Sequence, residues 1–138
     1  MTEIPEGFKP ARFDGQYLKH VGPYYTKKTD DTVLVGLNVE DHHINYVDIA
    51  HGGILTTLAD VALSFQVYLV ERPAPVVTTV SLTTNFLGAV KLGDFLIADG
   101  YIDRLGKRLA YTHGAIRRGD DVVMTMNGVF NVQRRSAK

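Results

Sequence analysis

The chain has 138 residues, of which 45% are hydrophobic and 22% charged, and it contains 15 basic residues, 15 acidic residues and no cysteine. This length fits a single domain, and the balanced charge gives no field that would attract nucleic acid or an anionic membrane. The lack of cysteine excludes disulfides, thiolate catalysis and cysteine-ligated zinc.

We expect one domain over residues 1–138, with an N-terminal lead-in over 1–15 and a solvated basic tail over 134–138. The N-terminal residues lack the basic-then-apolar pattern of a secretion signal. The longest apolar stretch, residues 61–70, is too short and too polar to span a bilayer. The expected location is therefore the cytoplasm.

The first elements are two strands. Residues 17–28 are rich in aromatic and β-branched side chains and predict a strand interrupted at Gly22 and Pro23. Residues 32–39 alternate, which indicates a half-buried strand whose apolar face consists of Val33, Val35, Leu37 and Val39.

A polar loop over residues 40–51 and the pair Gly52 and Gly53 then lead into the single strong helix of the sequence. The segment 54–71 is free of glycine, and its apolar residues occur around almost the whole helical circumference. A helix with that pattern is expected to be buried on all sides.

Four further strands are predicted over residues 76–87, 94–103, 107–117 and 121–132. The turns at 104–106 and 118–120 each contain glycine, as is typical between antiparallel strands. In the last strand the predicted core face consists of Val122, Met124, Met126, Phe130 and Val132. The elements together indicate an α+β fold in which an antiparallel sheet wraps around one long central helix.

Asp60 is the first candidate for chemistry, because it interrupts the apolar helix on a thin polar stripe with Thr57 and Ser64. Burying a carboxylate is costly unless it is paired, and such residues often mark functional sites. The alternative is a structural aspartate that Thr57 and Ser64 satisfy. The sequence pattern alone leaves both interpretations open.

The start of the helix, His51-Gly52-Gly53, is the second candidate. The first N–H groups of a helix have no internal acceptors, and they suit a developing oxyanion on a carbonyl. Gly52 and Asp60 lie about 12 Å apart along a helix that rises 1.5 Å per residue. One substrate carbonyl cannot reach both groups of the same helix, so a site that uses both would be shared across a dimer interface.

A metal site is an alternative for the residues of the polar loop, which include Asp41, His42, His43, Asp48 and His51. His42 and His43 are adjacent and diverge on an extended chain, and no pair of histidines has the spacing of one helical face. We therefore expect no metal. His20 and His113 fall in predicted strands and are expected to be ordinary structural or surface residues.

The chain resembles the PaaI-type thioesterases of the hot-dog superfamily over about residues 30–133. The resemblance rests on Asn45, on His51-Gly52-Gly53, and on Leu58-Ala59-Asp60 at the start of the buried helix. The later segments 75–87, 91–94 and 106–111 follow in the order of the family's strands.

This resemblance implies a cytoplasmic acyl-CoA thioesterase that is a homodimer with shared active sites, or a homotetramer built as a dimer of dimers. Asp60 would act as nucleophile or general base, and Thr79 would assist it. The Gly52 N–H of the partner subunit would polarise the thioester carbonyl, with Asn45 and His51 beside it. Gly53 and the run Gly106-Lys107-Arg108 would contact the CoA, which is part of the substrate, and no other cofactor is implied.

Two positions depart from that pattern. The family often has glycine three residues after the Asn45 position, and here this residue is Asp48. Thr79 falls on the strand face opposite Val80 and Leu82, so it reaches Asp60 only if that face or a β-bulge turns it inward.

Two other functions stay open. A hot-dog hydratase or dehydratase would use a histidine, here His51, with the carboxylate of the helix. A non-enzymatic acyl-CoA-binding sensor would retain the CoA ester unchanged. For a thioesterase, the candidates to line a pocket for an aryl or medium-chain acyl group are Tyr46, Phe65, Tyr68 and Phe86, and no sequence rule fixes which of them face it.

Overall fold

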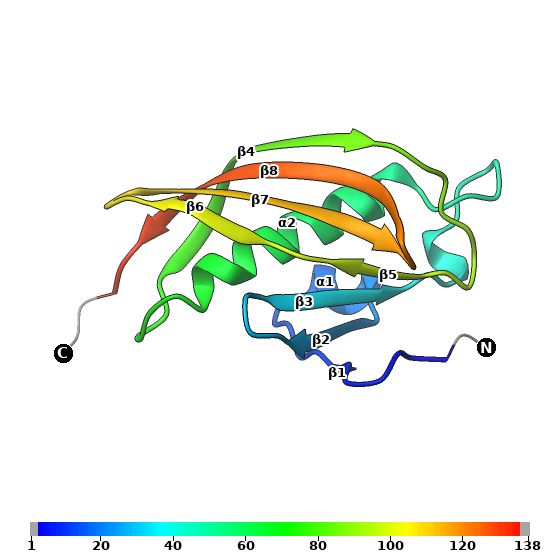
Figure 1. Cartoon of the computed structure of the whole chain (residues 1–138), viewed down its shortest axis with the longest axis horizontal. Coiled ribbons are helices and arrows are strands. Elements are labelled where there is room, and N and C mark those ends of the chain that lie inside the picture. Colours follow the sequence, from blue (N-terminus) through cyan, green and yellow to red (C-terminus); the bar gives the residue numbers. More distant parts are fainter. Residues whose placement is uncertain (1–2, 136–138) are drawn as a thin grey trace.

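A computed structural model describes residues 3–135 and shows one curved antiparallel sheet around one long helix (Figure 1). The strand order is β1-β2-β3-β5-β7-β8-β4, and β6 pairs with β7 beside this path. The elements in chain order are β1 (Lys9–Pro10), α1 (Gln16–Val21), β2 (Tyr24–Lys28), β3 (Val33–Asn38), η1 (Asp41–His43), α2 (Gly52–Tyr68), β4 (Val76–Phe86), β5 (Phe95–Ala98), β6 (Tyr101–Leu105), β7 (Leu109–Arg118) and β8 (Asp121–Gln133). The predicted α+β architecture is confirmed.

Helix α2 is the centre of the core. Leu58 and Leu63 of the helix are fully buried, as is Phe130 of β8. The helix begins at Gly52 and ends at Tyr68. Its burial is less complete than the sequence predicts, because the stripe that contains Asp60 and Ser64 is only partly covered. None of the described helices is long and apolar enough to cross a membrane.

The predicted strand over residues 17–28 is wrong in its first half, where the chain forms α1. Leu18 and Val21 of this segment pack against the core. They are three residues apart, which is the spacing of neighbours on one helical face. The strand begins only at Tyr24, whose ring is buried.

The predicted strand over 94–103 is two strands, β5 and β6, with a break at Asp99 and Gly100. A Cβ atom at Gly100 would lie only 2.9 Å from the carbonyl oxygen of Ala62, so the backbone of α2 approaches the sheet closely there. A glycine at such a break suits a sheet that bends around a helix.

The core face of β8 is correct from Met124 onward but not at its start, where Val123 is buried and Val122 is 36% exposed. The register between β7 and β8 shifts so that Ile116 pairs with Met124 and Arg117 with Val122. Val123 is therefore the extra residue of a β-bulge, which reverses the inward and outward alternation.

Candidate active site

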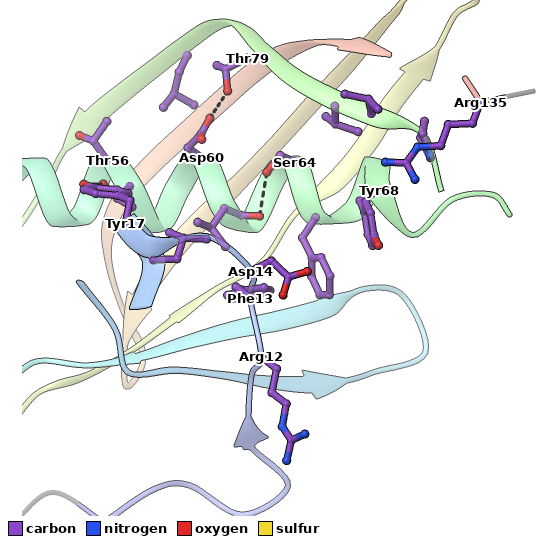
Figure 2. A pocket seen from close by; sticks show the side chains of 18 residues that line it. Arg12, Phe13, Asp14, Tyr17, Thr56, Asp60, Ser64, Tyr68, Thr79 and Arg135 are labelled. Carbon is purple, nitrogen blue, oxygen red and sulfur yellow. Dashed lines mark hydrogen bonds between the residues drawn. The ribbon is translucent and has the colours of Figure 1, made fainter. Parts of the chain in front are cut away.

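A cavity of about 840 Å³ lies between the partly covered face of α2, strand β4 and the N-terminal segment (Figure 2). Helix α2 contributes Asp60, Ser64, Phe65 and Tyr68, and β4 contributes Thr79. The lining combines a mainly apolar wall with a few hydroxyl, carboxylate and guanidinium groups, which is the usual composition of a small-molecule site.

Among the described residues, Asp60 accepts a single hydrogen bond, from Thr79, whose Oγ1 lies 2.6 Å from Asp60 Oδ1. Within residues 3–135 no basic side chain forms an ion pair with Asp60. The hydroxyl of Thr57 donates to the Gly53 carbonyl, and that of Ser64 donates to the Val61 carbonyl. The structural interpretation in which Thr57 and Ser64 satisfy Asp60 is therefore wrong.

A β-bulge in β4 brings Thr79 to Asp60. Thr79 pairs with Phe130 and Ser81 pairs with Val129, so Val80 has no partner in the register. The inserted residue turns the Thr79 side chain toward α2, while Val80 remains 58% exposed. This is the bulge on which the predicted Thr79–Asp60 contact depends.

At the start of α2, His51 is the N-cap, and its Nδ1 accepts a hydrogen bond of 2.8 Å from the Gly53 N–H. The Ile54 N–H donates to the His51 carbonyl. For the Gly52 N–H, the described part of the chain offers no acceptor. Of the two glycine amides that the sequence singled out, Gly52 is thus the one free to bind a substrate oxygen.

Gly52 and Asp60 are two turns apart on α2, as the sequence predicts, so they lie about 12 Å apart along the axis. A single carbonyl cannot contact both within one chain. The shared site across a dimer stays a prediction.

The family model described as "Thioesterase superfamily" matches residues 48–125. The chain belongs to the thioesterase superfamily. A Pseudomonas aeruginosa protein described as a "putative esterase" is 32% identical over 133 residues, which are 96% of this chain and 99% of that protein. Human acyl-coenzyme A thioesterase 13 is 31% identical over 80 residues, 58% of this chain and 56% of the human one.

Among solved structures, a hypothetical thioesterase of Streptococcus pneumoniae, determined with coenzyme A, superposes on this thioesterase with a TM-score of 0.74 at 28% identity. The superposition covers 82% of this chain and 88% of the other. The predicted hot-dog fold and thioesterase family are therefore confirmed.

In the loop before α2, Asp48 occupies a position where the family often has glycine, and its backbone conformation accounts for both residue types. Asp48 has a φ of 64°, which lies in the left-handed region that favours glycine and that aspartate tolerates better than most residues. The side-chain carbonyl of Asn45 accepts hydrogen bonds from the N–H groups of Val47 and Ile49 at 3.0 and 3.2 Å. The Asn45 oxygen therefore shapes this loop, and its amide NH₂ is the group left for a ligand.

The hairpin between β6 and β7 forms a second hollow, of about 720 Å³, lined by Arg104, Gly106, Lys107, Arg108, Leu109 and Tyr111. Arg134 donates to the carbonyl of Lys107 at 2.6 Å and to that of Gly106 at 3.3 Å, and it forms an ion pair of 2.8 Å with Glu71. Sequence reasoning missed the role of Arg134, because its contacts with Gly106 and Lys107 join residues that are distant in the sequence.

Of the solvated tail predicted for residues 134–138, the structure describes Arg134 and Arg135, and both are exposed. Arg134 is bound to the hairpin and to Glu71, and Arg135 lines the cavity beside α2 (Figure 2). The remaining residues of the predicted tail, 136–138, lie outside the described residues.

The two adjacent histidines of the loop bind backbone carbonyls. His42 Nε2 donates to the Gly22 carbonyl and His43 Nε2 donates to the Val21 carbonyl, both at 2.6 Å. Residues 3–135 contain no group of three or more histidine, aspartate or glutamate side chains that could hold a metal ion. The imidazoles thus attach the loop before α2 to the end of α1.

Proposed function

We propose that this thioesterase hydrolyses the thioester of an aryl- or medium-chain acyl-CoA to the free acid and CoA, with Asp60 as its catalytic carboxylate. The observation that carries the proposal is the Asp60 side chain, which faces the cavity with Thr79 as its one hydrogen-bond partner among the described residues. The human relative named acyl-coenzyme A thioesterase and the Streptococcus structure with coenzyme A support the choice of substrate.

Two routes fit an aspartate in this position. As a general base, Asp60 takes a proton from a water whose oxygen forms the new bond to the thioester carbonyl carbon. As a nucleophile, its oxygen forms that bond itself and gives a mixed anhydride, which water then cleaves. In both routes the bond to sulfur breaks and CoA leaves as a thiolate that takes up a proton. Thr79 keeps the carboxylate oriented in either case.

The thioester carbonyl oxygen would accept a hydrogen bond from the Gly52 N–H of a second copy of the chain. Asp60 and Gly52 of one copy are too far apart for a single carbonyl, so a complete site needs two copies in a homodimer. The open N–H at the positive end of the α2 dipole suits the negative charge that develops on this oxygen. Two such dimers would form the predicted dimer of dimers.

The nucleotide end of CoA would bind at the β6–β7 hairpin, where Lys107 and Arg108 supply positive charge for phosphates. Arg134 supports this assignment, because its hydrogen bonds to the carbonyls of Gly106 and Lys107 hold the hairpin backbone in place. Asn45, His51 and Gly53 would surround the bound thioester at the helix start, where His51 itself is held by its hydrogen bond from Gly53.

The activity is tested by thiol release from a panel of aryl-, short-, medium- and long-chain acyl-CoAs, with wild type beside Asp60→Asn. We expect wild type to release thiol and the variant to lose nearly all of that rate. Retention of bound, uncleaved CoA esters by wild type would instead support the sensor, and hydration of an enoyl-CoA would support the hydratase.

The shared site is tested with two substitutions at Gly52. Proline lacks the N–H and is well tolerated at the first position of a helix, and the His51 ψ of 135° suits a residue that precedes proline. Alanine keeps the N–H and places its Cβ at the same distance, 3.3 Å, from the Phe86 ring, so it is the matched control. We expect Gly52→Pro to lose activity and Gly52→Ala to keep most of it.

Mixed dimers of Gly52→Pro and Asp60→Asn then distinguish a shared site from a site within one chain. If each site takes Gly52 from one copy and Asp60 from the other, a mixed dimer contains one intact site, and co-expression restores activity that neither variant has alone. Mixed dimers without activity, or a fully active monomer by light scattering, would contradict the shared site.

A further inference from the structure

The N-terminal segment of residues 11–17 forms one wall of the cavity beside Asp60. The Ala11 N–H donates to the Tyr24 carbonyl at 2.9 Å, and the Phe13 ring packs edge-to-face on the Phe65 ring with 5.2 Å between centroids. Tyr17 Oη and Thr57 Oγ1 are 2.8 Å apart. The segment is therefore attached to α2 on both sides of Asp60, at Thr57 and at Phe65.

This wall lies outside residues 48–125, the part of the chain that the thioesterase family model matches. The carboxylate, the helix start and most of the sheet belong to the matched part, whereas Phe13 and Tyr17 do not. The chemistry of the site thus comes from the shared part of the fold, and the shape of this wall comes from a segment outside it.

The cavity runs along α2 from Asp60 to an aromatic end. Asp60, Ser64 and Tyr68 are spaced four residues apart and lie on one face of the helix, so the cavity extends about 12 Å from the carboxylate to Tyr68. The rings of Phe65 and Tyr68 are stacked at 6.2 Å, and the Phe13 ring contacts the Phe65 ring edge-to-face at 5.2 Å. An apolar group attached to a carbonyl at Asp60 would meet these three rings.

We infer that Phe13 is a specificity-determining residue that limits the length of the acyl group, because its ring narrows the aromatic end of the cavity. This inference rests on the proposed function, since it takes Asp60 as the position of the thioester carbonyl. The acyl group lies along α2 and extends from Asp60 toward the contact between Phe13 and Phe65. A smaller side chain at position 13 opens the end of the cavity, and a larger one shortens it.

The test compares kcat/KM for long- and short-chain acyl-CoAs in wild type, Phe13→Ala and Phe13→Trp. One methylene in an apolar pocket changes kcat/KM by about 10-fold or more, so the long-to-short ratio should rise by about 10-fold in Phe13→Ala. The ratio should fall in Phe13→Trp. Opposite shifts from the two variants are an outcome that a general loss of stability does not produce.

Phe8→Ala is the matched control. Phe8 lies just before the N-terminal segment and packs edge-to-face on Phe95 at 5.2 Å, the same spacing as Phe13 and Phe65, but it does not line the cavity. We expect Phe8→Ala to lower the midpoint of thermal unfolding and to leave the long-to-short ratio unchanged. An equal shift of that ratio in both alanine variants would overturn the inference.

Phe13→Leu provides a milder change in case the alanine variant does not fold, and it should raise the ratio in the same direction by a smaller amount. An unchanged ratio in the folded Phe13 variants overturns the role of Phe13 while leaving the thioesterase proposal intact. Failure of wild type to cleave any acyl-CoA would instead contradict the proposed function itself.

Discussion

Two aspartates of this chain, in different regions of the fold, carry the same charge in opposite surroundings. Asp99 lies at the break between β5 and β6, where its Oδ1 accepts the Ala115 N–H and its Oδ2 pairs with the Arg117 guanidinium. Asp60 lies at the cavity wall, and its one hydrogen bond among the described residues comes from the uncharged hydroxyl of Thr79. Both carboxylate oxygens of Asp99 have partners within the fold, whereas Asp60 Oδ2 has none among the described residues.

The same contrast holds for N–H donors. The Gly53 N–H is satisfied by the His51 side chain, and the Gly52 N–H beside it has no acceptor within residues 3–135. Leaving a polar group without a partner costs stability unless solvent or a ligand serves it. The open carboxylate and the open amide both belong to α2, so in the proposed function this helix carries the chemistry and the sheet supports it.

Paired substitutions of the two aspartates test this comparison most strongly. Asp60→Asn keeps the shape but removes the base, so kcat should fall by at least about 10²-fold with little change in thermal stability. Asp99→Asn removes the charged partner of Arg117, so the free energy of unfolding should fall by about 2 kcal/mol while kcat stays near the wild-type value. Thiol release and urea unfolding measure the two effects. Near-normal turnover in Asp60→Asn would return that residue to a structural role.

Thr79 provides a smaller test, because its hydroxyl donates a hydrogen bond to the Asp60 carboxylate. Thr79→Val keeps the β-branched shape and removes the hydroxyl, and we expect kcat to fall by about 10-fold, which corresponds to about 1.4 kcal/mol for a hydrogen bond to a charged group. Thr78→Val is the matched control on the same strand, since Thr78 does not line the cavity. Equal losses in both variants would assign the effect to β4 as a whole.

The sequence predicted α2, the later strands and the central wrapping of the sheet because these depend on local periodicity. It could not predict the bulge at Val123 or the break at Gly100, which arise from the pairing of distant strands and from close approach to α2. It also assigned the wrong element to residues 17–21, where aromatic composition concealed the helical spacing of Leu18 and Val21.

For the candidate site, the pattern identified Asp60 and the helix start, and the family resemblance identified Thr79. From the sequence, Thr79 could contact Asp60 only if its strand face or a β-bulge turned it inward. The pairing of β4 with β8 contains such a bulge between Thr79 and Ser81. The contacts of Phe13 with Phe65 and of Arg134 with the 106–107 carbonyls join residues far apart in the sequence. No local motif encodes such contacts, so sequence reasoning could not assign their roles.

The smallest expected effect concerns His43, a titratable side chain whose two ring nitrogens, like the carboxylate oxygens of Asp99, both have hydrogen-bond partners. His43 is 3% exposed; its Nε2 donates to the Val21 carbonyl, and its Nδ1 accepts the Glu40 N–H at 3.0 Å. Burial is the main cause that lowers the pKa of His43 below 6.5, and the nearby His42 lowers it further, against the opposing influence of the Val21 carbonyl and Glu40. The folded chain therefore favours the neutral imidazole.

This lowered pKa fixes the sign of a pH effect on stability. At a pH well above 6.5 the imidazole is neutral in both the folded and the unfolded chain, and its contribution to stability is fully present. As the pH falls below 6.5, the unfolded chain takes up a proton that the folded chain resists, so the free energy of unfolding should decrease. Urea unfolding between pH 7.5 and 5 measures this slope. His43→Gln should flatten this slope. His20→Gln is the control, because His20 lies on the exposed surface of α1, and it should leave the slope unchanged. An unchanged slope in His43→Gln would show that other groups cause the pH dependence.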